Sequence, residues 1–287
     1  MSATIIIAVI SGVLLGLCLG TLGGGGSILA VPILVSALGV GPRPATSASL
    51  IIVGLTSAVA AIAHARGGRV RWKAATAFGV IGSTTAFAGS VLNRAVDPQI
   101  LMIAFSVLMV AAAIGMLRRT TQPEQQQDLA AADAHHTACA PTTPPAAAPA
   151  TRPRTHVAWA AKFVATALAV GFLTGFLGVG GGFLIVPALV LAMDYSMPIA
   201  VGTSLVIIAI TSAAAFAARL PAAHIPWTLV ASFTAAAIAG SLSGTAISER
   251  ISGAKLTRSF AVALIAVAVY VALTAGLHLV HEHPPSP

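Results

Sequence analysis

Charge is what this sequence has least of. Only 8% of its 287 residues are charged, whereas a soluble globular domain carries about 25%. No Lys, Arg, Asp or Glu precedes Arg43, and none occurs from Phe163 to Met193. With 57% hydrophobic residues, the chain cannot form a water-soluble surface, and its uncharged runs are long enough to cross a bilayer. The sequence therefore predicts an all-α, multi-pass membrane protein, which we place in the inner membrane of the cell.

The sequence also has few of the residue patterns that form disulfides, metal sites or catalytic sites. The two cysteines, Cys18 and Cys139, form neither a disulfide framework nor a zinc-binding spacing. His135 and His136 lie near Cys139 in a polar tract, where we expect no metal, and we predict no cofactor. No pair of carboxylates lies within an apolar run, which disfavours an enzyme with its active site in the membrane. The basic residues that give the net charge of +8 lie between apolar spans, so we attribute them to the positive-inside rule and not to nucleic-acid binding.

A glycine motif occurs twice in the chain. Residues 20–32 read GTLGGGGSILAVP and residues 175–187 read GFLGVGGGFLIVP, so that Pro32 and Pro187 lie 155 positions apart. The same offset pairs Trp72 with Trp227. A glycine run inside an apolar segment predicts a helix that stops and restarts, which a bilayer tolerates only where the backbone is buried in protein or lines a cavity. Paired breaks in two halves of a chain point to the binding site of a transporter.

The offset divides the chain into two membrane repeats. We predict the first repeat at 1–117, a disordered Pro- and Ala-rich linker on the cytoplasmic side at 118–156, the second repeat at 157–278 and a tail at 279–287. Each repeat has four or five helical segments and opens with a glycine-broken, re-entrant helix pair. The segments are expected at 5–22, 27–38, 45–63, 74–92 and 98–117, and again at 163–179, 182–193, 199–218, 227–247 and 259–277.

The loop charges favour repeats that are inverted relative to each other. In that arrangement the basic loops after His64 and after Glu249 share the cytoplasmic side. Whether each glycine break forms a hairpin or two full crossings stays open, because both give the same orientation.

The breaks themselves predict an anion site near the middle of the membrane. A helix that restarts after Gly26 or Gly181 leaves its first backbone amides unpaired, and these amides together with the helix dipole favour an anion. Hydroxyl groups in the third segment of each repeat can line the same pathway, or can equally bond to the carbonyl one turn back. The predicted substrate-binding residues are Gly23, Gly24, Gly25, Gly26, Ser27, Ser49, Thr56, Ser57, Gly178, Gly180, Gly181, Gly182, Thr203, Ser204, Thr211 and Ser212.

Three further features have structural interpretations. Gly12 and Gly16 have the spacing of a helix-packing face. Trp72 and Trp227 open spans at the level of the lipid headgroups. His64 ends a span beside a basic loop, where an interface role is favoured over a role as proton carrier.

These residues resemble the sulfite exporter (TauE/SafE) family of membrane permeases. The resemblance rests on the duplicated Gly-x-x-x-Gly-x-x-Gly-x-Gly-Gly-x-x-x-x-Val-Pro pattern, on the Thr/Ser-Ser-Leu helix starts and on the Trp that opens each fourth segment, and it covers both halves. The chain departs from the pattern at Ser27, whose counterpart is Gly182, and at His64, whose counterpart is Arg219. The resemblance implies transport of sulfite, sulfonates or related sulfur anions.

We therefore expect a secondary transporter or exporter of small anions and no enzyme. A passive anion channel is the alternative, and a membrane-embedded enzyme comes third. The expected partners are the anionic substrate and the lipid bilayer, and assembly into a homo-oligomer stays open.

Overall fold

The computed structural model describes residues 2–27, 30, 33–39, 42–93, 95–96, 100–101, 103–118, 156–177, 182–217 and 227–282. Within these ranges the chain forms helices joined by loops and no β-strand, which confirms the predicted all-α class. The helices are α1 (Ser2–Leu22), α3 (Pro42–Arg66), α4 (Trp72–Asn93), α6 (His156–Leu177), α7 (Gly182–Leu191), α8 (Met197–Ala217), α9 (Trp227–Arg250) and α10 (Gly253–Glu282), with the short turns η1 (Gly24–Gly26) and η2 (Ile33–Ala37) and a further helix at Ile103–Arg118.

The helices have the length and surface of membrane spans. Five are long and apolar enough to cross a bilayer: Pro44–Arg66, Trp72–Asn93, Trp159–Leu177, Met197–Ala217 and Trp227–Arg250. Large apolar side chains point outward from them, such as Val80, which is 60% exposed, and Phe87, which is 71% exposed. Such surfaces are costly in water and expected against lipid tails. The protein is therefore a multi-pass membrane protein.

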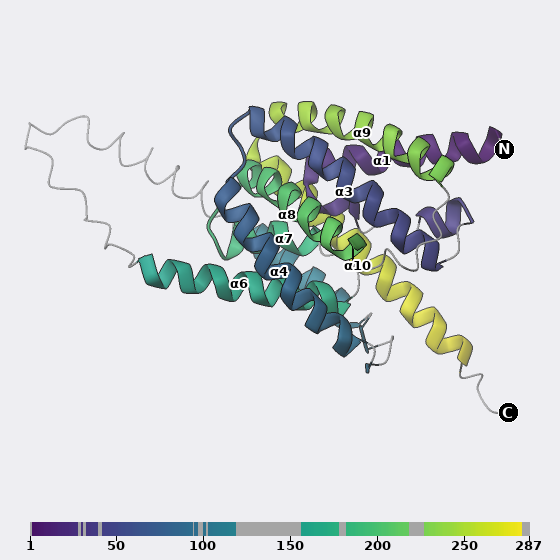
Figure 1. Ribbon diagram of the computed structural model, residues 1–287. Helices are drawn as coiled ribbons and strands as arrows, with labels where there is room; N and C mark the ends of the chain where they lie inside the picture. The colour runs from purple at the N-terminus through teal and green to yellow at the C-terminus, as the bar shows by residue number, and fades with distance from the viewer. Residues whose placement is uncertain are drawn as a thin grey trace, which may run out of the picture.

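Two long helix pairs form the sides of the molecule, α1 with α9 and α4 with α6 (Figure 1). In the first pair Gly16 of α1 lies against the backbone of Ala237 of α9, and in the second Gly171 of α6 lies against the backbone of Gly82 of α4. Both members of the second contact are 155 positions from their counterparts in the first. Small residues let membrane helices approach until their backbones touch. We call these two contacts the glycine seams; they confirm the packing role predicted for Gly16, and Gly12 lies against Phe233 of α9 in the same way.

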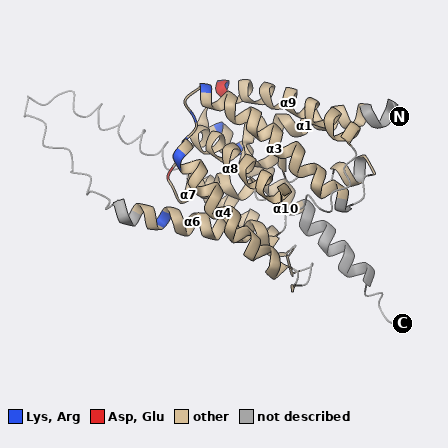
Figure 2. Ribbon diagram, viewed as in Figure 1, with Lys and Arg blue, Asp and Glu red and all other residues tan. Residues whose placement is uncertain are grey.

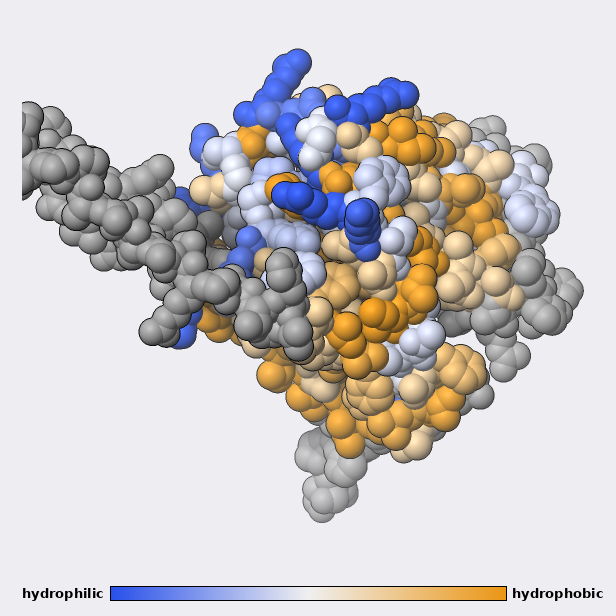
Figure 3. All heavy atoms as spheres, turned by 60° about the vertical axis from the view of Figure 1, so that its left-hand side comes forward, coloured by the Kyte–Doolittle hydropathy of each residue, from blue (hydrophilic) through white to orange (hydrophobic). Residues whose placement is uncertain are grey.

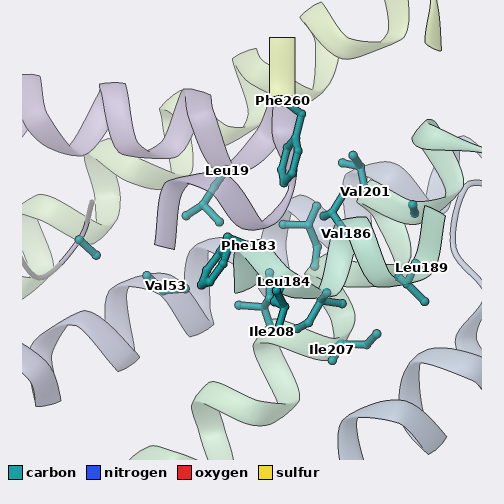
Figure 4. Packing of buried hydrophobic residues seen from close by; sticks show 14 of the residues in the cluster. Leu19, Val53, Phe183, Leu184, Val186, Leu189, Val201, Ile207, Ile208 and Phe260 are labelled. Atoms are coloured by element: carbon teal, nitrogen blue, oxygen red, sulfur yellow. The ribbon is translucent and has the colours of Figure 1, made fainter. Parts of the chain in front are cut away.

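The centre of the molecule lies between the seams. There α3 packs against α8, and α7 packs against α8 and η1. All residues of α7 are buried except Ala188 and Leu191. Figure 4 shows Leu19 of α1, Val53 of α3, Phe183 of α7 and Ile208 of α8 in one apolar core. The central helices thus meet around the first turn of α7.

The charged residues that Figure 2 colours blue and red gather at one end of the bundle. Arg69, in the loop between α3 and α4, pairs with Glu249 at the end of α9 at 3.8 Å. Lys162 of α6 pairs with Asp194, in the loop between α7 and α8, at 3.9 Å. The hydrophilic surface at this end borders a hydrophobic one (Figure 3). We call this the charged end; in a membrane it would lie at one surface of the bilayer.

Several predicted boundaries move in the structure. The predicted starts of α4 and α9 at or near Trp72 and Trp227 are confirmed within two residues. α6 begins at His156, not at Phe163, because its extra turns are held by Trp159 stacking on Phe163 (5.4 Å between ring centroids) and by the ion pair of Lys162.

The third segments also begin earlier than predicted, at Pro42 in α3 and at Met197 in α8, so that the Thr/Ser clusters lie inside these helices. The predicted short helix at 27–38 includes the wider π turn of η2. Pro32 precedes that turn and has no backbone N–H with which to continue a regular α-helix. Nearly all of the predicted linker and half of the predicted tail lie outside the described residues.

Candidate substrate-binding site

The first glycine run turns the chain at the end of α1. Gly23 has φ = 75°, in the left-handed region that glycine adopts most readily, and its N–H donates to Leu19 O at 2.9 Å. Gly24 to Gly26 then form a 3₁₀ turn, closed by the N–H of Ser27 on Gly24 O. The run itself thus forms a tight helical turn, and Ser27, where the sequence predicted the helix to restart, is α-helical.

The first glycine run contacts Gly182, the last glycine of the second run. Gly24 packs against the peptide between Gly182 and Phe183, where α7 begins, so closely that a Cβ atom on Gly24 would overlap Gly182 O. A Cβ atom on Gly182 would in turn lie 2.6 Å from Ser27 Oγ. The first turn of α7 thus begins directly against the end of the first break. Gly178, Gly180 and Gly181 lie outside the described residues.

The glycines of the first run have different surroundings. A Cβ atom on Gly26 would lie 2.8 Å from Leu15 O of α1, so close packing is enough to explain this glycine. Gly25 is half-buried and has room for a Cβ atom, with its nearest neighbour, Leu22 Cβ, at 3.6 Å. Gly23 lies beside α8, where a Cβ atom would be 2.8 Å from Ser204 Oγ.

Most predicted site hydroxyls that have a resolved partner bond to a carbonyl on their own helix. Ser27 Oγ donates to Gly24 O at 2.7 Å and Ser204 Oγ donates to Val201 O at 2.8 Å. The remaining bonds of this kind are Ser49 Oγ to Thr46 O at 2.9 Å and Thr211 Oγ1 to Ile208 O at 3.2 Å. Thr203 Oγ1 instead accepts the N–H of Arg71 at 3.3 Å. A hydroxyl that donates to a carbonyl still has lone pairs but has no proton left for an anion.

Thr56 and Ser57 are the exception. Both residues are fully buried in the middle of α3, and neither hydroxyl has a hydrogen-bond partner among the described residues. One turn earlier on the same helix, Val53 contributes to the core around the first turn of α7 (Figure 4). A buried polar group without a partner is costly and rare, and it requires an explanation such as a ligand or an internal water. These hydroxyls still have protons to donate, which is what an oxyanion needs.

Side chains from neighbouring helices bind the carbonyls at the ends of α1 and α6. His64 Nε2 lies 3.1 Å from Gly20 O, and Asn93 Nδ2 donates to Phe176 O at 2.6 Å. The last carbonyls of a helix have no partner within it, so these contacts fix the helix ends beside the breaks. Asn93 was not among the predicted residues, although a side-chain amide at the end of an uncharged span is a usable signal.

Three of the helices at the breaks carry no fixed charge. Neither α1 nor α7 nor α8 contains a Lys, Arg, Asp or Glu. No group of three or more metal-ligating side chains occurs in the described residues. Recognition there would depend on neutral donors, namely hydroxyls and backbone amides, which suit an anion that must be released again.

The structure thus brings Gly23, Gly24, Ser27, Gly182 and Ser204 together at the meeting point of the breaks. The described hydroxyl candidates Ser49, Thr56, Ser57, Thr203, Thr211 and Ser212 lie on α3 and α8, which pack against each other, and Gly25 and Gly26 lie in η1. Gly26 is separated from this group by facing α1.

Comparisons with known proteins assign the whole chain to one family. The family model described as "Sulfite exporter TauE/SafE" matches residues 8–271. A protein named "Probable membrane transporter protein" from Xylella fastidiosa (strain Temecula1 / ATCC 700964) is 35% identical over 274 residues, which are 93% of this chain and 95% of the relative. The "Probable membrane transporter protein YunE" of Bacillus subtilis (strain 168) is 27% identical over 75% of this chain and 79% of its own. No solved structure matches.

Proposed function

The chain belongs to the sulfite exporter TauE/SafE family of membrane transporters, and from this membership we propose that it carries small sulfur oxyanions, sulfite or sulfonates, as a secondary transporter. Its substrate would bind where the two glycine breaks meet, between α1, α3, α7 and α8. The proposal goes beyond the family's general transport role in naming a substrate class and a site.

One observation carries the site: Thr56 and Ser57 are fully buried with hydroxyls that lack a partner in the described part of the chain. They lie in α3, which packs on α8 in the same centre as the first turn of α7. Hydroxyl protons and the amides that begin a helix are both donors, and together they would surround an oxyanion without a buried Lys or Arg. Gly182, where α7 begins, completes the proposed site, and Ser27 and Ser204 lie beside it with their hydroxyl protons already bonded to carbonyls.

The movement of substrate would follow from two inverted repeats, 1–117 and 157–278. The glycine seams, whose contacts recur at an offset of 155 positions, support this arrangement. The ion pair of Arg69 with Glu249 supports it too, because it joins a basic loop of the first half to one of the second at the charged end. One half would rock against the other around the breaks, and contact between Gly24 and Gly182 would close the path.

A passive anion channel is the second candidate, and the uncharged surroundings of the breaks favour it over an enzyme. The two candidates differ in whether the protein can accumulate its substrate. A channel only equilibrates an anion, whereas a transporter coupled to a second ion concentrates it.

The test is transport by the purified full-length protein in liposomes, with labelled sulfite and labelled methanesulfonate as probes. We expect saturable uptake of both anions and mutual competition between them, and no uptake of labelled tetramethylammonium, a permanent cation of similar size to methanesulfonate. Accumulation above equilibrium when an ion gradient is imposed would identify a transporter, and equilibration alone a channel. Protein that moves neither anion would contradict the proposed function.

A further inference from the structure

The C-terminal end of α3 holds a buried ionisable group that the proposed site does not use. His64 is only 1% exposed, and its Nε2 lies 3.1 Å from Gly20 O, in the last turn of α1 before the first break. Its Nδ1 is buried and has no partner among the described residues. The imidazole therefore binds the end of α1 through Nε2, and its Nδ1 has no hydrogen-bond partner in the described residues.

The contact with Gly20 determines which ring nitrogen of His64 carries the proton. A carbonyl oxygen can only accept, so this hydrogen bond requires a proton on Nε2. In the neutral ring Nδ1 then carries a bare lone pair. This is the atom that can take up a proton, and a protonated ring keeps its bond to Gly20 O.

Partly exposed charged side chains lie near His64 at the charged end. The side chains of Arg69 and Glu249, which form an ion pair at 3.8 Å, are 25% and 45% exposed, and both charges act on the imidazole. The N–H of Arg69 also donates to His64 O at 3.2 Å, which ties this loop to the end of α3. Among the helices that pack around the ring, α1 carries one ionisable side chain, Cys18, and α8 carries none. The ion pair is thus the exposed link between His64 and the bulk solvent.

We propose that His64 is a proton-binding site that couples anion transport to a proton gradient, an inference that rests on the proposed function. A proton taken from water at the charged end binds Nδ1, and Nε2 keeps its own. The imidazolium and an anion near the first break attract each other, so each raises the affinity for the other. Proton and anion then cross in the same direction, and the proton leaves Nδ1 on the far side once the anion has dissociated.

The second half lacks such a group at the equivalent position, because Arg219 replaces the histidine there. A guanidinium stays protonated throughout the physiological range and cannot carry a proton in a cycle. One proton site is therefore expected per chain, with His64 as the carrier.

The experiment uses full-length protein in liposomes and methanesulfonate, which stays ionised at all working pH values and so brings no proton of its own. The membrane potential is clamped with valinomycin and equal potassium on both sides. In wild-type protein, acid outside should drive accumulation of labelled methanesulfonate inside. His64→Gln should lose this accumulation and still exchange internal for external methanesulfonate at saturating anion, with a weaker apparent affinity because the imidazolium charge is gone.

The glutamine variant separates the two roles of the histidine. Its side-chain amide can still donate to Gly20 O but does not titrate, whereas His64→Ala removes both features and should also lower the melting temperature. Accumulation by His64→Gln at the wild-type level would overturn the inference, and so would a parallel loss of exchange and accumulation. Wild-type protein that exchanges methanesulfonate without responding to the pH gradient contradicts only this inference, whereas protein that exchanges no anion contradicts the proposed function as well.

A second measurement needs no variant. Methanesulfonate binding to wild-type protein is measured by calorimetry in two buffers with different ionisation enthalpies. A difference between the apparent binding enthalpies reports uptake of protons with the anion, as we expect. Equal enthalpies in the two buffers would overturn the inference.

Discussion

The glycine seams and the centre of the molecule are made of the same small and hydroxyl-bearing residues, yet they differ in how their polar groups are satisfied. In the seam between α1 and α9, Thr245 Oγ1 donates to Ser241 O at 2.9 Å, and a matching bond joins Thr85 Oγ1 to Gly82 O at 3.2 Å in the other seam. In the centre, the hydroxyls of Thr56 and Ser57 have no partner among the described residues. The seam hydroxyls named here are thus satisfied within the protein, whereas these two central hydroxyls are not satisfied by any described residue.

The same contrast separates equivalent positions of the two halves. Thr211 occupies the place of Thr56 at the offset of 155 residues, and its hydroxyl bonds to Ile208 O at 3.2 Å. The hydroxyl of Thr211 is thus hydrogen-bonded within its own helix, whereas the hydroxyl of Thr56 has no partner in the described residues. The seam contacts recur at the same offset in both halves, but of this pair of threonines only Thr56 keeps a hydroxyl without a partner in the described residues.

The largest loss of stability is expected when a methyl group is added to a glycine of a seam. A Cβ atom at Gly16 would overlap the backbone of Ala237, so Gly16→Ala must separate α1 from α9. We expect a loss of about 3 kcal/mol in the free energy of unfolding, the upper part of the range for overpacked sites. Thermal unfolding in detergent, together with the yield of folded protein, measures it.

Gly82→Ala is the matched control for this prediction. At Gly82 a Cβ atom would be 3.8 Å from its nearest neighbours, and the equivalent position of the other seam is already alanine, Ala237. We expect wild-type stability. Equal losses in the two variants would contradict the description of the seams.

A smaller effect is expected inside the first break. Gly24→Ala would push a methyl group into the peptide that joins Gly182 to Phe183, while Gly25→Ala meets only ordinary contacts. We expect Gly24→Ala to lower stability by about 2 kcal/mol and to lower sulfite uptake into liposomes as well. Gly25→Ala should match the wild type in both. A tolerated methyl at Gly24 would mean that the two breaks do not touch in the membrane.

Much of this fold could be read from the sequence because hydrophobic length and tryptophan placement are local signals. Trp72 and Trp227 marked the starts of α4 and α9, and the spacing of Gly12 and Gly16 indicated a packing face. The partner of that face could not be predicted, since glycine spacing says that a backbone comes close but not which one. The start of α6 at His156 was missed because it depends on a stacking contact and an ion pair with a distant loop.

The candidate site was predictable in composition but not in detail. Glycine runs and hydroxyls could be named, yet which hydroxyls bond to their own helix depends on rotamers that a sequence does not fix. From the sequence, all of Ser57, Ser204 and Thr211 were predicted to bind substrate. Of these three hydroxyls, only that of Ser57 lacks a hydrogen-bond partner in the described residues. Asn93 was missed because its bond to Phe176 O requires knowing that α4 lies beside α6.

The most direct test of the central claim is sulfite binding to Thr56→Val, measured by calorimetry alongside thermal unfolding. Valine has nearly the shape of threonine and removes only the unpartnered hydroxyl, so stability should stay the same or rise. Loss of a hydrogen bond to an anion should weaken binding by about 1.5 kcal/mol, roughly tenfold. Thr234→Val, which removes a hydroxyl bonded to Val230 O at 2.6 Å in α9, should leave binding unchanged. Thr56→Val with wild-type affinity for sulfite and reduced stability would contradict the account, because the hydroxyl would then be structural.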